Sequence, residues 1–167
     1  MIYIGTAGFS YQDWKGAFYP EDQDKRHMLE YYSSRFPVVE VNSTWHALPS
    51  PKSILSMARR TPPDFEFILK AYKGLTHQQE DNDEEFARFR DLIRPMEDHG
   101  KLACILAQFA WGFKNTDANR DYLKHFREKL PDQDIAVEFR NEGWITDETI
   151  DLLKQLAQLE RKGGRGL

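Results

Sequence analysis

The chain has little cysteine and no long apolar run. Of its 167 residues only Cys104 is a cysteine, so no internal disulfide can form. No stretch approaches the roughly 20 apolar residues of a membrane-spanning helix, and the first residues lack the basic segment of a secretory signal. We therefore expect a soluble, cytoplasmic protein with no membrane partner, in which Cys104 packs as a small buried residue.

An excess of charge of one sign is also missing. Lysine and arginine number 23 against 27 aspartate and glutamate residues, which gives a formal net charge of -4. A protein that coats nucleic acid needs a basic face. The balance argues against a general DNA-binding protein, although it leaves room for a local basic pocket.

Short motifs that bind phosphates or metals are absent as well. No helix follows Gly5-Thr6-Ala7-Gly8 at the position that a glycine-rich phosphate loop requires. The histidines have neither His-x-His nor His-Glu-x-x-His spacing, and the acidic run at residues 80–85 lacks the spacing of a calcium loop. We predict no metal site, the weaker alternative being a set of Glu40, His77 and Glu138, and the sequence identifies no cofactor.

What the chain does have is a regular alternation of strand-like and helical patterns. Apolar runs begin near residues 2, 38, 65, 102 and 135. Between and after them, apolar residues at helical spacing predict five helices, over about 24–36, 51–61, 83 onward, 117–130 and 147 onward. Pro95 is expected to kink or end the third helix early. The last helix carries Ile150, Leu153 and Ala157 on its inner side.

Five β-α units in succession predict a parallel sheet with right-handed crossovers. A closed (β/α)₈ barrel typically needs about 250 residues, and the chain covers roughly two thirds of that length. We therefore predict that residues 1–160 form a truncated TIM barrel with about five units and an open sheet edge, a small open sheet being the alternative. Residues 161–167 are expected to be a disordered tail of glycine and basic residues.

Several short stretches together resemble a known family. They lie at residues 5–11, 14–20, 39–44, 48–49, 61–65 and 67–70, and continue as Thr76-His77, Gln108-Phe109, Glu138-Phe139-Arg140 and Trp144. In this order and spacing they resemble the YecE-like family, the domain of unknown function 72. The resemblance runs from Gly5 to about Leu153. It implies a bacterial TIM barrel of roughly 240 residues or more, without an established biochemical activity.

The chain departs from the family pattern in three places. It lacks the last barrel strands, including a Tyr-x-Arg-x-His-Gly-like stretch. Trp45-His46 stands where Phe-Tyr is usual, and Ala110-Trp111 stands where prolines usually follow Gln-Phe. Residues that the missing strands supply to the family are therefore absent from this chain.

Polar residues recur where the apolar runs end, which in an α/β barrel is the functional face. Glu40 and Asn42 share one side of their run and Glu138 and Arg140 share one side of theirs, because strand side chains alternate between faces. We predict Glu40, Glu138 and the loop residue His77 as acid-base catalysts. The predicted ligand-binding residues are Asn42, Lys70, Gln108, Arg140, Trp14 and Trp144.

Each of these assignments has a structural alternative. The glutamates can simply neutralise Arg140 or Lys70, His77 can be an exposed loop residue without a role, and the tryptophans can pack. Three functional interpretations follow: an enzyme with hydrolytic or acid-base chemistry on an anionic, sugar-like or nucleotide-like ligand; a non-catalytic barrel that binds a ligand or nucleic-acid fragment; or an inactive fragment that self-associates through its open sheet edge.

Overall fold

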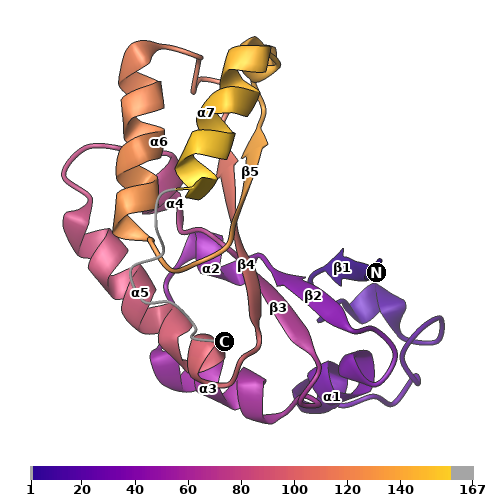
Figure 1. Ribbon diagram of the computed structural model, residues 1–167. Helices are drawn as coiled ribbons and strands as arrows, with labels where there is room; N and C mark the ends of the chain where they lie inside the picture. Colours follow the sequence, from indigo (N-terminus) through magenta and orange to yellow (C-terminus); the bar gives the residue numbers. More distant parts are fainter. Residues whose placement is uncertain (1, 159–167) are drawn as a thin grey trace.

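Five parallel strands, each paired with the next one along the chain, form the sheet (Figure 1). The computed structural model describes residues 2–158, and the predicted tail at 161–167 lies outside them. All pairings are parallel, as the alternation of patterns predicted. The strands are β1 (Gly5–Ala7), β2 (Val38–Val41), β3 (Glu66–Lys70), β4 (Leu102–Phe109) and β5 (Ile135–Phe139).

The connections between strands are helical. They contain α1 (Met28–Ser33), α2 (Ser43–His46), α3 (Pro51–Arg59), α4 (Lys73–Thr76), α5 (Asp83–Asp98) and α6 (Asp117–Lys129), and α7 (Asp147–Gln158) follows β5. Short 3₁₀ turns cover Gln12–Trp14, Lys25–His27 and Glu142–Trp144. Ser50 and Thr116 cap α3 and α6, each accepting a hydrogen bond from the amide three residues later.

Side chains of the three central strands divide sharply between the two faces of the sheet. One set lies fully buried under the helices: Val39, Val41, Phe67, Leu69, Ile105, Ala107 and Phe109. Their neighbours point the other way and are partly exposed: Glu40, Ile68, Lys70, Cys104, Leu106 and Gln108. The helices therefore cover one face, and the polar strand residues share the opposite face. The valines of β2 thus pack under the helices, on the face opposite to Glu40.

The first strand begins later than the apolar run predicted. Ile2, Tyr3 and Ile4 are 90%, 52% and 69% exposed, and β1 starts at Gly5, which pairs with Val38. The only neighbour of β1 among the described residues is β2, and Pro37 precedes β2 without an amide hydrogen for further pairing. The start of β2 at Val38 thus sets the start of β1 at Gly5.

Three helix predictions need correction. The segment predicted as one helix over 24–36 is a 3₁₀ turn followed by the short α1. Pro95 does not end α5, which continues to Asp98, because a proline near a helix end removes few hydrogen bonds and the fully buried Met96 anchors the last turn. Ile150 is 51% exposed, whereas Thr149, beside it on α7, is buried.

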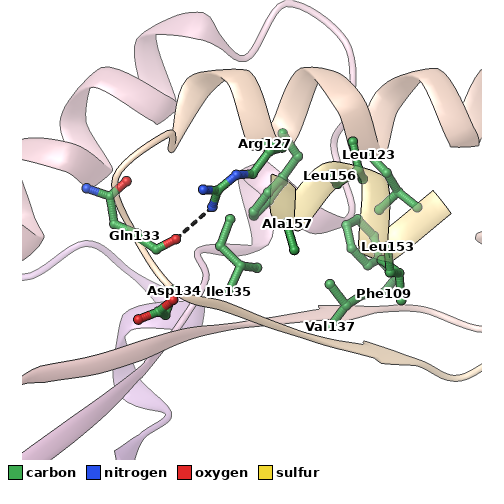
Figure 2. Close-up of a pocket in the computed structure, with 11 residues that line it drawn as sticks. Phe109, Leu123, Arg127, Gln133, Asp134, Ile135, Val137, Leu153, Leu156 and Ala157 are labelled. Carbon is green, nitrogen blue, oxygen red and sulfur yellow. Dashed lines mark hydrogen bonds between the residues drawn. The ribbon is translucent and has the colours of Figure 1, made fainter. Parts of the chain in front are cut away.

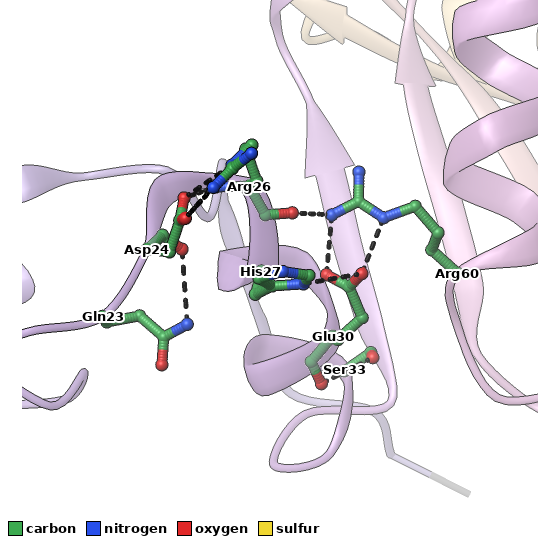
Figure 3. Close-up of polar contacts among 7 residues, drawn as sticks. All are labelled: Gln23, Asp24, Arg26, His27, Glu30, Ser33 and Arg60. Atoms are coloured by element: carbon green, nitrogen blue, oxygen red, sulfur yellow. Dashed lines mark hydrogen bonds and ion pairs between the residues drawn. The ribbon is translucent and has the colours of Figure 1, made fainter.

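An ion pair joins two of the helical connections (Figure 3). Arg60, at the end of α3, donates from Nε and from one terminal nitrogen to the two carboxylate oxygens of Glu30 on α1, both at 2.7 Å. The same guanidinium also donates to the carbonyl of Arg26. The hydrogen bonds from Arg60 are the main cause of the lowered pKa of Glu30. The pair ties the crossover after β1 to the crossover after β2.

No helix within residues 2–158 combines the length and the apolar character that crossing a membrane requires.

Candidate functional site

The polar residues predicted from the sequence at the strand ends lie at the carboxyl ends of the strands, on the face of the sheet without helices. The strand register places Glu40 beside Ile68, Lys70 beside Leu106, and Gln108 beside Glu138. Asn42 and Arg140 follow directly after β2 and β5. Because all strands run in the same direction, these residues lie together at the carboxyl ends of the strands, which we call the rim.

One cluster of the rim is internally paired. Gln108 Nε2 donates to Glu138 Oε2 at 2.7 Å, and Arg140 Nε lies 2.8 Å from Glu138 Oε1. Both carboxylate oxygens of Glu138 therefore have a partner from β4 or β5. The side chains of Arg140 and Glu138 are 58% and 39% exposed. This arrangement matches the neutralising alternative and also holds the carboxylate in one orientation.

A second cluster lies at the ends of β2 and β3. Lys70 Nζ is 5.8 Å from the centre of the Trp45 ring, and the His77 ring meets Trp45 edge to face at 5.3 Å between centres. No carboxylate of residues 2–158 lies within ion-pair distance of Lys70. Burial and, second, the charge of Lys70 lower the pKa of His77. The imidazole is therefore neutral at neutral pH, with Nδ1 2.9 Å from the Thr76 hydroxyl.

Two buried polar atoms beside this cluster lack a hydrogen-bond partner among the described residues. They are Asn42 Oδ1, an acceptor, and Trp45 Nε1, a donor. Buried polar groups are nearly always hydrogen-bonded, so an unpartnered pair at a strand end needs an explanation. In the sequence, Trp45 stands out only because Trp45-His46 replaces the Phe-Tyr usual in the family. Its position three residues after Asn42, at a strand end, was the signal available.

The loop that carries His77 is held from behind. The Asn82 amide nitrogen lies 3.1 Å from the carbonyls of Gly74 and Gln78 and donates to Tyr122 Oη at 2.7 Å. Tyr122 in turn donates to the Leu75 carbonyl at 2.6 Å, and burial raises its pKa to about 12. Asn82 stands at the N-cap position of α5, but its side chain makes no capping hydrogen bond to the helix and turns back to the loop instead.

The two tryptophans predicted to bind ligand have packing roles. Trp144 is 2% exposed, stacks on Phe139 with ring centres 4.4 Å apart, and donates from Nε1 to the Phe113 carbonyl at 2.6 Å. Trp14 packs among Tyr11, Phe18 and Tyr19 in the loop after β1. Neither residue belongs to the rim clusters, and their assignment as ligand-binding residues stays a prediction.

An open cleft of about 560 Å³ extends from His77 between the loops that follow β3 and β4. It is lined by Thr76, His77, Gln78, Gln79, Glu80, Ala110, Gly112, Phe113 and Asn119. No three His, Cys, Asp or Glu side chains of the described residues converge as a metal site requires. Because His77 lines the cleft and also contacts the Trp45 ring, the cleft adjoins the Lys70 cluster.

A smaller cavity of about 210 Å³ lies on the helix side, between α6, α7 and β5 (Figure 2). Its lining is largely apolar, and the Arg127 guanidinium beside it donates to the carbonyls of Gln133 and Pro131, each at 2.7 Å. Under the helices, it opens on the face opposite to the polar rim residues. We do not include it in the candidate site.

These features define an α/β protein with a sequentially ordered parallel sheet, helices against one face, and a polar rim where the strands end. The chain belongs to the family described as protein of unknown function DUF72, whose model matches residues 3–160. The resemblance inferred from the short stretches is thereby confirmed.

Relatives of the chain come from several bacteria. It is 32% identical to the UPF0759 protein YunF of Bacillus subtilis over 92% of its own length and 30% identical to the UPF0759 protein YecE of Escherichia coli over 84%. These matches span 57% and 49% of the relatives, so the chain covers about half of the length of the curated proteins it matches.

Solved structures of the family share the architecture. A DUF72 family protein from Thermotoga maritima superposes with a TM-score of 0.84 at 38% identity, covering 94% of this chain and 62% of that one. A DUF72 family protein from Enterococcus faecalis gives a TM-score of 0.79 at 28% identity, covering 93% and 57%. The fold of this chain is thus shared with both solved structures.

Proposed function

We propose that the five strands are consecutive strands of a (β/α)₈ barrel. Strand order supports this proposal, since β1 to β5 follow one another without reversal. Right-handed crossovers in one direction place all helices on one face, whereas a doubly wound sheet reverses its strand order and has helices on both faces. In the barrel, the face that carries Glu40, Lys70 and Gln108 becomes the interior.

In a barrel, the two edge strands that lack a second neighbour among the described residues pair with further strands. Those edge strands are β1 and β5, and the chain spans only 57% of its relative YunF, whose remaining residues are long enough to supply the other strands of a barrel. Light scattering during size exclusion tests the 167-residue chain. A monomer is expected; a dimer would favour the alternative that the edges pair between copies.

For the rim we propose binding of an anionic small molecule at the Lys70, Trp45 and His77 cluster. The observation that carries this proposal is the combination of two unmatched groups, namely a lysine without a carboxylate partner among the described residues beside the buried, unpartnered donor Trp45 Nε1. A phosphate or carboxylate supplies the negative partner that Lys70 lacks. Its oxygens accept hydrogen bonds from the Trp45 indole and the Lys70 ammonium.

The same geometry supports acid-base chemistry. His77 is neutral near pH 7, and in the tautomer in which Nδ1 donates to the Thr76 hydroxyl, Nε2 is the ring nitrogen that takes a proton from a bound molecule. Glu138, oriented by Gln108 and Arg140, and Glu40 on the same face are the carboxylates available to assist. Binding without turnover is the second candidate, favoured by the full pairing of Glu138.

An NMR titration with inorganic phosphate tests the binding step. The indole N–H resonance of Trp45, assigned from Trp45→Phe, is expected to shift on saturation, and Lys70→Met to weaken binding about tenfold. Lys52→Met, an equal loss of charge on the exposed side of α3, serves as the matched control. Equal phosphate affinity in the Lys70 and Lys52 variants would contradict the proposal.

Turnover separates the two candidates once a substrate is in hand. If the barrel is an enzyme, His77→Gln is expected to abolish turnover while binding is largely kept, because the imidazole moves the proton and Lys70 holds the anion. Full activity of His77→Gln, Glu40→Ala and Glu138→Ala would rule out the acid-base assignment.

A further inference from the structure

The cleft beside His77 continues the proposed anion site along the rim. His77 lines the cleft and also contacts the Trp45 ring, so a ligand held at Lys70 extends past His77 into the space between the two loops. The volume of about 560 Å³ lies within the range of roughly 300–1,000 Å³ typical of ligand sites. It is far larger than a phosphate or carboxylate group alone requires.

The cleft lining is rich in side-chain amides. Neither Gln78 nor Gln79 uses its side chain in a hydrogen bond within the described residues. Asn119 engages its nitrogen with the Lys114 carbonyl at 2.7 Å, so its oxygen remains available. Amides offer both donors and acceptors. They therefore suit sugar hydroxyl groups, each of which donates and accepts.

The rest of the lining combines apolar surface from Ala110 and Phe113 with the polar side chains of Thr76 and Glu80, which can also hydrogen-bond sugar hydroxyls. Phe113 contributes to the lining, and an added side-chain carbon at Gly112 would meet nothing within 4 Å, so the backbone there is open to a ligand. Trp111, between the two lining residues Ala110 and Gly112, is 67% exposed, and its carbonyl accepts a hydrogen bond from Asn141 at 2.8 Å. The loop thus presents apolar surface from a tethered backbone.

The cleft is also built on supported backbone. Asn82 and Tyr122 bind the carbonyls of Gly74, Leu75 and Gln78 on one side of it. On the other side, the Phe113 amide donates to the Ala110 carbonyl at 2.9 Å. A binding surface held in place before the ligand arrives loses less conformational entropy on binding.

We propose that the ligand is a sugar that carries an anionic group, with the anion at Lys70 and the sugar hydroxyls among the amides of Gln78, Gln79 and Asn119. This inference rests on the proposed anion site and names the class of molecule that site takes. The anionic group is a phosphate or a carboxylate, two sources that share the same contacts with Lys70 and Trp45.

Calorimetry on the 167-residue chain tests the inference with four probes: glucose 6-phosphate, glucuronate, inorganic phosphate and glucose. At least one anionic sugar is expected to bind ten times more tightly than inorganic phosphate, and glucose only weakly. The first two probes distinguish a phosphate from a carboxylate as the anion. Anionic sugars that bind no more tightly than phosphate would overturn the sugar inference while leaving the anion site intact.

Variants separate the two parts of the site. Gln78→Ala/Gln79→Ala is expected to remove the tenfold gain of the anionic sugar and leave phosphate affinity unchanged. Neither side chain has a folding role among the described contacts, and an unchanged amide spectrum checks the fold. Gln155→Ala, on the exposed side of α7, is the matched control. If the double variant keeps the full gain, the inference fails; if Lys70→Met leaves phosphate binding intact, the proposed function fails instead.

Discussion

Polar side chains near the two ends of the rim differ in whether they have hydrogen-bond or ion-pair partners. At β4 and β5, Glu138 has a partner for each oxygen, and Trp144 donates its indole hydrogen to a carbonyl. At β2 and β3, Lys70 has no carboxylate partner among the described residues, and the indole of Trp45 has no acceptor there. A polar residue at a strand end is therefore not informative by itself. A polar residue that already has a hydrogen-bond or ion-pair partner in the fold is a structural group, whereas one without such a partner is a candidate for ligand binding.

The largest expected effect contrasts the two tryptophans. Trp144→Phe is expected to lower the free energy of unfolding by about 2 kcal/mol, because it opens a cavity and leaves the buried Phe113 carbonyl without its donor. Trp45→Phe removes an N–H that has no partner within residues 2–158, so its expected loss stays below about 0.5 kcal/mol. Urea unfolding measures both, and similar losses would contradict the contrast.

Next comes anion affinity. Lys70→Met is expected to weaken phosphate binding about tenfold, which is roughly 1.4 kcal/mol, whereas Arg140→Met changes it less than about twofold because Glu138 already compensates that charge. Calorimetry of the two variants at one salt concentration makes the comparison. A larger loss in Arg140→Met would move the anion site to the β5 end.

The pH dependence is a smaller effect. The lowered pKa of His77 means that it is neutral in the empty site above about pH 6.5. A bound anion favours the imidazolium, so proton uptake accompanies binding and affinity rises as pH falls through this range. We expect sulfate, which does not titrate here, to bind about threefold more tightly at pH 5.5 than at pH 7.5.

His77→Gln is expected to remove that dependence, and His99→Gln, at the end of α5, to retain it. His46, whose ring lies 4.7 Å from that of Trp45, is the other titratable ring beside the cluster. If the dependence survives in His77→Gln and disappears in His46→Gln, the proton-accepting residue is His46.

The smallest expected effect concerns the paired end. Glu138→Gln removes the charge of a partly exposed ion pair, which solvent screens, so a loss of about 0.5 kcal/mol in unfolding free energy is expected, with phosphate affinity unchanged. Urea unfolding and calorimetry check the two statements. A marked change in phosphate affinity would show that the two ends of the rim act as one site.

Sequence patterns predicted the elements better than their ends. The strand pattern of β2 and the caps of α3 and α6 followed from local chemistry. The start of β1 did not, because pairing with β2 decides it, and neither did the continuation of α5 past Pro95, because the burial of Met96 holds the last turn. Such outcomes depend on neighbours that are distant in the chain.

The candidate site divides in the same way. Alternation along β2 and β5 was enough to place Glu40 with Asn42 and Glu138 with Arg140 on shared faces. It was not enough to predict that Gln108 bonds Glu138, which depends on the register between β4 and β5. The cleft residues Gln78, Gln79 and Asn119 were not predicted, because the two segments that enclose the cleft, residues 76–80 and 110–119, lie far apart in the sequence.

The sequence by itself determined the alternation of strands and helices, the family, and the face on which each strand residue lies, since these depend on local periodicity and on ordered short motifs. Only the tertiary structure decided which polar groups are satisfied. A hydrogen bond between side chains of different strands requires their separation within about 3 Å, and that distance is set by register and packing across the whole sheet. Trp45 and Trp144 are the same type of residue, and they differ in whether the fold places a hydrogen-bond acceptor beside the indole nitrogen.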